Sequence, residues 1–137
     1  MANSVYPKFK EYALNVALGG GAQKTGTLKA ALVSSGYTYN AAHDFRDDLG
    51  ANVVGTPTAV ASPTFTDGVL DGGDVTFNAV SGSAVASIVV YLDTSGADST
   101  DPLVCYIDTG VTGLPVTPNG GDIKVTWSNG SAKIFAL

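Results

Sequence analysis

Short apolar runs with a period of two, separated by turn signals, recur through most of this 137-residue chain. Alternate residues of a strand share one face, so runs of this kind predict β-strands. About seven short strands at spacings of roughly 8 to 15 residues predict an antiparallel β-sandwich or a barrel-like domain. The expected extended segments are 28–33, 58–61, 69–70, 75–79, 85–92, 103–108, 123–128 and 132–137.

Three of these segments carry more detailed expectations. Leu28, Ala30 and Leu32 share one face of their strand, whereas the centre of 85–92 is apolar on both faces. A strand that is apolar on both faces is expected in the middle of a sheet, covered from both sides. Asn129-Gly130 is a strong hairpin signal because both residues accept positive φ. We therefore expect 132–137 to return beside 123–128 as a closing strand.

The N-terminal segment has a helical rather than a strand period. Val5, Phe9, Tyr12 and Val16 recur at spacings of three to four, Ser4 is a candidate N-cap, and the glycines at 19–21 end the pattern. The chain is thus expected to form a single domain over 1–137, with a helix at 4–18, a glycine-rich hinge at 19–27 and a β-sandwich at 28–137.

A short helix is stable only when its apolar stripe packs on something. The two candidates are the chain's own sheet and a neighbouring subunit. We expect Phe9, Tyr12 and Val16 to pack on the chain's own sheet.

The charge of the chain argues against two classes of partner. Seven Lys and Arg residues are dispersed through a chain of net charge −5. Nucleic acids and anionic membrane surfaces both require clustered cations, so we expect neither as a partner. No apolar run is long enough to cross a bilayer, and the first residues do not read as a secretory signal, which predicts synthesis in a cytoplasm.

No pattern of catalytic or metal-ligating residues stands out. His43 and Cys105 are the single histidine and cysteine, too few for the usual zinc sets, and no nucleophile elbow occurs. We expect His43 in a loop turn and Cys105 in the core. Calcium is the open alternative, at oxygen-rich loops, but Asp and Gly are also ordinary turn residues. We therefore expect no catalytic residue, cofactor or metal. The aspartates concerned are Asp67, Asp71, Asp74, Asp93, Asp98 and Asp101.

The aromatic side chains mostly fall at core positions, including Phe65. Tyr37 and Tyr39 differ because they lie in a polar loop, where we expect them to be exposed. Exposed tyrosines bury much area at low entropic cost and are common interface anchors. The candidate interface residues are Tyr37, Tyr39, Phe9 and Tyr12. The same two tyrosines, with the aspartates of loop 93–101, form a possible sugar-stacking site.

A series of short motifs runs the length of the chain. The most distinctive is Leu114-Pro115-Val116-Thr117-Pro118-Asn119-Gly120-Gly121-Asp122-Ile123. The others are Tyr6-Pro7-Lys8-Phe9-Lys10, Leu28-Lys29-Ala30-Ala31-Leu32-Val33, His43-Asp44-Phe45 with Asp47-Asp48-Leu49, Asp67-Gly68-Val69, Gly73-Asp74-Val75-Thr76-Phe77, Trp127-Ser128-Asn129-Gly130 and Lys133-Ile134-Phe135. With these motifs the chain resembles small virion proteins of tailed bacteriophages.

The resemblance implies a non-enzymatic virion component made in the host cytoplasm. Its first implication is a capsid decoration (cement) protein on the capsid exterior, bound to the major capsid protein. Proteins of this role are often homo-oligomers, and a trimer is one form. The resemblance leaves placement in the tail or neck open. The rival hypothesis, which rests on Tyr37, Tyr39 and the aspartates of loop 93–101 rather than on the resemblance, is a carbohydrate- or receptor-binding β-sandwich displayed on the virion.

Overall fold

The computed structural model describes residues 3–21 and 24–136, so part of the predicted hinge (residues 22 and 23) lies outside the described residues. In chain order the elements are β1 (Ser4–Val5), α1 (Pro7–Ala17), β2 (Thr27–Ser34), the 3-10 segment η1 (Arg46–Asn52), β3 (Val53–Ala59), β4 (Thr64–Thr66), β5 (Val69–Asp71), β6 (Val75–Phe77), β7 (Val85–Asp93), the 3-10 turn η2 (Asp98–Thr100), β8 (Leu103–Ile107), β9 (Ile123–Val125) and β10 (Phe135–Ala136).

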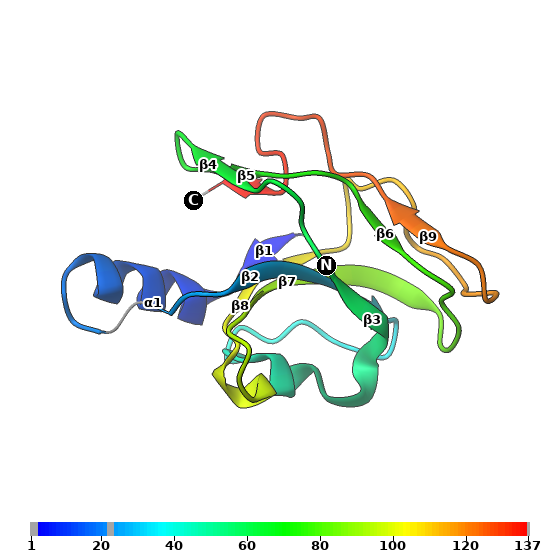
Figure 1. Ribbon diagram of the computed structural model, residues 1–137, viewed down its shortest axis with the longest axis horizontal. Helices are drawn as coiled ribbons and strands as arrows, with labels where there is room; N and C mark the ends of the chain where they lie inside the picture. Colours follow the sequence, from blue (N-terminus) through cyan, green and yellow to red (C-terminus); the bar gives the residue numbers. More distant parts are fainter. Residues whose placement is uncertain (1–2, 22–23, 137) are drawn as a thin grey trace.

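The strands form three antiparallel sheets (Figure 1). The main sheet has the order β1-β8-β7-β2-β3, and two small sheets, β10-β5-β4 and β6-β9, lie over one of its faces. Among the described residues the sheets do not close into a barrel. The predicted class, a mainly β sandwich-like fold with one N-terminal α-helix, is confirmed.

The two central strands of the main sheet separate two hydrophobic cores. β7 lies between β8 and β2, as its apolar faces predict. Ala30 and Leu32 of β2 enter the inter-sheet core, which lies beneath the two small sheets, whereas Ala31 and Val33 enter the core on the opposite face. That second core contains four buried tyrosines, and we call it the tyrosine core. Its tyrosines are Tyr6, Tyr37, Tyr91 and Tyr106.

The irregular segment that follows β2 packs against the main sheet at the tyrosine core. Leu49 of η1 is fully buried there, and Tyr37 and Tyr39 join it. Cys105, on the other side of β8, is buried in the inter-sheet core, as its apolar surroundings predict. Burial raises the pKa of the Cys105 thiol, so the side chain stays neutral at physiological pH.

The helix begins later than predicted. Ser4 does not cap it: Ser4 and Val5 form β1, paired with Tyr106 and Cys105 of β8. Tyr6 is the N-cap residue, with ψ of 128° and no side-chain cap. A residue before proline avoids the α conformation, and proline is well suited to the first helical turn, so the helix begins at Pro7. In Figure 1, α1 projects sideways from the sheets.

The predicted closing hairpin is wrong. β9 pairs with β6, Val125 lying opposite Val75, whereas β10 pairs with β5, Phe135 lying opposite Leu70. Residues 130–133 turn the chain away from β9, and Lys133 N–H donates to the Gly130 carbonyl at 3.2 Å. Phe135 enters the inter-sheet core from the β10-β5-β4 sheet.

Candidate interaction surface

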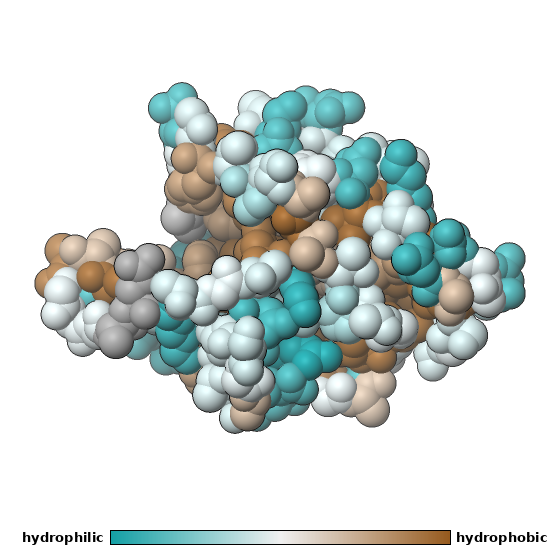
Figure 2. Space-filling view, in the orientation of Figure 1, coloured by the Kyte–Doolittle hydropathy of each residue, from teal (hydrophilic) through white to brown (hydrophobic). Residues whose placement is uncertain are grey.

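Large apolar side chains are exposed on α1, at its C-cap and on the nearby β4–β5 hairpin. Leu14 is 61% exposed, Leu18 is 78% exposed and Phe65 is 53% exposed. Figure 2 shows apolar surface on α1 and over the β4–β5 region beside it. Single exposed apolar residues are ordinary, but a group of them on neighbouring elements is typical of an interaction site.

A groove lies between these two elements. We call it the helix groove; its volume is about 300 Å³. Phe65 and Phe135 stand together on its sheet side, with ring centroids 6.1 Å apart. Among the described residues that line it, Lys24 alone is charged, so the groove offers mainly apolar contact. The lining residues are Phe9, Tyr12, Ala13, Val16, Lys24, Leu28, Phe65, Leu70, Leu92, Val104 and Phe135.

Two of the predicted interface residues, Phe9 and Tyr12, line this groove. Both are partly buried, and their ring centroids are 6.3 Å apart. The Tyr12 hydroxyl accepts a hydrogen bond from the backbone N–H of Lys24 at 2.7 Å, which joins the helix to the segment before β2. Phe9 also packs against both cores, so the chain's own sheet holds the first half of α1 through this residue. The expectation that Tyr12 and Val16 pack on the sheet as well stays a prediction.

The sequence did not reveal the rest of this surface. Leu14 and Leu18 fit the apolar stripe of a helix, and Phe65 fits a core position, yet all three are exposed. The prediction that Phe65 is a core residue is wrong because β4 is an edge strand with every residue exposed.

Tyr37 is buried, contrary to the expectation of an exposed loop tyrosine. Its hydroxyl lies 2.9 Å from the Tyr6 hydroxyl and 2.9 Å from His43 Nδ1. Its ring packs against those of His43 and Tyr106. Burial raises the pKa of Tyr37, and both burial and the bond to Tyr37 raise the pKa of Tyr6. Tyr37 therefore serves the tyrosine core in this conformation and presents no free ring face for a sugar.

Tyr39 is only partly buried, and its interface role stays a prediction. Its ring centroid lies 5.2 Å from that of Tyr6 and 5.5 Å from that of Tyr106. The contacts fix the ring at the rim of the tyrosine core, where part of it reaches the surface.

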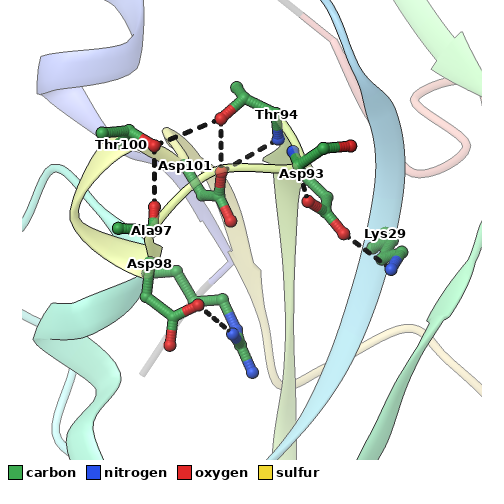
Figure 3. Close-up of polar contacts among 9 residues, drawn as sticks. Lys29, Asp93, Thr94, Ala97, Asp98, Thr100 and Asp101 are labelled. Carbon is green, nitrogen blue, oxygen red and sulfur yellow. Dashed lines mark hydrogen bonds and ion pairs between the residues drawn. The ribbon is translucent and has the colours of Figure 1, made fainter.

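The aspartates of loop 93–101 are bound by the protein itself (Figure 3). Asp101 is buried, and its Oδ1 accepts bonds from the backbone N–H and the hydroxyl of Thr94, at 2.9 and 2.7 Å. Asp93 pairs with Lys29 at 2.6 Å, and this bond lowers the pKa of Asp93. Asp98 pairs with Arg46. The aspartates of this loop therefore stabilise a folded turn and connect it to β2 and η1 through ion pairs.

In the second acidic segment, between β4 and β6, Asp71 and Asp74 also accept hydrogen bonds from the protein's own backbone. Asp71 Oδ1 accepts the N–H of Gly72 at 2.8 Å, and Asp74 Oδ1 accepts the N–H of Trp127 at 3.1 Å. In the part of the chain that the structure describes, no three His, Cys, Asp or Glu side chains gather as a metal site. Within the same residues no helix is long and apolar enough to cross a membrane.

Comparison with known proteins returned no match, either to a family model or to a curated protein. The helix groove, with Phe65 in its lining and with Leu14 and Leu18 exposed on the same helix, is the most apolar part of the surface described above.

Proposed function

We propose that this chain is a non-enzymatic structural protein of a tailed-phage virion, and specifically a capsid decoration protein that binds the major capsid protein lattice and stabilises the head. The observation that carries the proposal is the helix groove, which exposed Phe65 lines, together with Leu14 and Leu18, which are exposed on the helix outside the groove lining. The sequence resemblance to small virion proteins points to the same role.

An apolar contact of this size suits a protein that is present in many copies. Fully burying one Leu or Phe side chain contributes about 1.5 to 3 kcal/mol, so each copy binds modestly. On a capsid lattice, many such contacts act together. Because the groove lining holds a single charge, at Lys24, the contact is expected to be insensitive to salt.

The proposal is tested with capsids that lack this protein. Purified chain added to such capsids is expected to bind saturably, and the decorated capsids are expected to withstand a higher temperature before they lose their contents. Absence of saturable binding, or binding with no gain in heat resistance, would refute the decoration role.

The surface itself is tested by Leu18→Asp and Phe65→Asp, each of which places a charge in the proposed contact. Each change is expected to weaken capsid binding at least about ten-fold, because a buried apolar side chain is lost and a charge would have to be desolvated. Ser81→Asp, on the exposed loop between β6 and β7, is the matched control and is expected to bind normally. Circular dichroism verifies that all three variants fold. Equal binding by all three would place the contact elsewhere.

A further inference from the structure

A second groove, of about 600 Å³, opens beside β1, between the main sheet and the β10-β5-β4 sheet. We call it the edge groove. Ser4 and Val5 of β1 line it from the main sheet, and Phe135 and Ala136 of β10 line it from the small sheet. Each of these strands is the last one in its sheet. Two strand edges therefore border a single groove.

The edge at β1 has backbone groups available for a further strand. Tyr6 N–H donates to the Val104 carbonyl at 3.0 Å, and Ser4 lies opposite Tyr106. In an antiparallel pair every second residue directs its N–H and C=O away from its partner strand. Val5, between these two residues, therefore directs its backbone groups away from β8. Free groups of this kind are what an extended peptide binds when it adds to a sheet.

The charge of the groove is opposite to that of the molecule. Lys10 and Lys133 line it, and none of its lining residues is acidic, although the chain has a net charge of −5. Neither lysine forms a salt bridge with any residue that the structure describes. Two ammonium groups that have no salt bridge among the described residues lie beside two strand edges, and they favour an extended segment that carries carboxylates.

We propose that the edge groove binds an extended acidic peptide segment of another protein. The segment adds as a strand at Val5 and places carboxylates near Lys10 and Lys133, while its alternate apolar side chains face Ile134 and Phe135. Among the described residues, Phe135 is the one lining residue that the edge groove shares with the helix groove, and the proposal holds whether or not the chain decorates a capsid.

The test uses the full chain and a fluorescein-labelled, end-capped hexapeptide of alternating Glu and Val, with fluorescence anisotropy as the readout. Saturable binding of this peptide is expected, with at least about ten-fold weaker binding of the matched peptide of alternating Lys and Val. Equal binding of the two peptides would overturn the proposal.

Protein variants locate the site. Lys10→Glu and Lys133→Glu are each expected to weaken binding of the Glu-Val peptide about ten-fold, whereas Lys124→Glu, which makes the same charge change on β9 outside the groove, is expected to leave it unchanged. Equal effects of all three changes would mean that net charge alone attracts the peptide, and would overturn the site.

Strand addition has its own control. Methylating the backbone nitrogens on one edge of the Glu-Val peptide removes donors but keeps the charges. Loss of binding is expected when the methylated edge is the one that pairs, and unchanged binding with either edge methylated would overturn strand addition. Light scattering of the chain without peptide tests whether a second copy of the chain occupies the groove. A dimer that dissociates in the Lys10→Glu, Lys133→Glu double variant would assign the groove to a second copy instead.

Discussion

The tyrosine core depends on hydroxyl groups that satisfy one another. Tyr6 is fully buried, and its hydroxyl has that of Tyr37 within 2.9 Å; Tyr37 in turn reaches His43 Nδ1. Burying a hydroxyl without a hydrogen-bond partner costs free energy. Removing the Tyr37 hydroxyl, the middle one of the three linked groups, would leave the Tyr6 hydroxyl without its partner. Tyr37 is thus expected to contribute to stability through its oxygen as well as its ring.

Tyr37→Phe is expected to lower the free energy of unfolding by about 1 to 3 kcal/mol, because the buried Tyr6 hydroxyl loses its partner. Tyr39→Phe is the matched control, since the Tyr39 hydroxyl bonds no other described residue, and a change within about 0.5 kcal/mol is expected. Urea unfolding measures both. Equal values for the two variants would show that the hydroxyl chain contributes nothing to stability.

Alkaline pH is expected to destabilise the fold through the same tyrosines. Burial raises the pKa of Tyr6, Tyr37 and Tyr106 above 10.0, and that of Tyr91 to about 12. Above pH 10 the unfolded chain has lost these protons while the folded chain keeps them, so stability is complete below pH 10 and falls as pH rises further.

Urea unfolding at a series of pH values from about 8 to about 11 measures this loss, and absorbance at about 295 nm follows tyrosine ionisation. Four tyrosines are expected to ionise late, together with unfolding. Ionisation of all six tyrosines near pH 10, with the fold intact, would contradict the prediction.

Among the elements, α1 is held along only part of its length. Phe9 packs against both cores, whereas Leu14 and Leu18, further along, are exposed, and no residue of the helix is fully buried. Short helices depend on such packing, so the second half of α1 is less strongly held than the first.

Phe9→Ala is expected to cost about 1 to 2 kcal/mol of monomer stability, less than the 3 kcal/mol or so that a fully buried Phe would lose. Leu18→Ala is expected to change it by less than about 0.5 kcal/mol. Urea unfolding, with the mass checked by light scattering, measures both variants. A cost at Leu18 equal to that at Phe9 would mean that the whole helix is packed.

Elements whose pattern is local were predictable from the sequence. The alternation of Leu28, Ala30 and Leu32 correctly placed these residues on one face of β2, and the apolar centre of β7 correctly indicated a central strand that is covered on both faces. The Asn129-Gly130 signal failed because the choice of strand partner is not local: the following segment pairs with β5, and Phe135 packs in the inter-sheet core from there.

The candidate sites were less predictable than the fold. Tyr37 stands in a polar loop, and only its approach to Tyr6, 31 residues away, explains its burial. Phe65 was wrongly predicted to be a core residue, because nothing in the sequence around it marks β4 as an edge strand. No sequence pattern indicates that Lys10 and Lys133 lie in the same groove, because the edge groove exists only after two sheets are stacked.

At the scale of the whole molecule, the inter-sheet core connects all three sheets. Leu70 and Phe135 enter it from one small sheet, Phe77 and Val125 from the other, and Ile88 from the main sheet. Neither small sheet has another large core of its own, so their stability depends on contact with the main sheet. The chain is therefore expected to unfold as one cooperative unit, as a single domain should.

Trp127 provides the measurement of this cooperativity. It is 4% exposed beyond the end of β9, and its Nε1–H donates to the Gly73 carbonyl at 2.8 Å. Its fluorescence reports on the small sheets, whereas far-UV circular dichroism is dominated by the whole set of strands. Coincident urea transitions by the two signals are expected. A fluorescence transition at lower urea would show that the small sheets detach first.

The main sheet also divides the interior into two compartments with different chemistry. On β7, Ile88 and Val90 face a core without tyrosine, whereas Val89 and Tyr91 face the hydroxyl-rich one. Layers stacked on a sheet lie about 10 Å from it, beyond the range over which most substitutions couple. Apart from Phe9, which packs against both, the two compartments are thus free to diverge separately during evolution: one can be refilled with other aliphatic side chains while the other retains its network of hydroxyls.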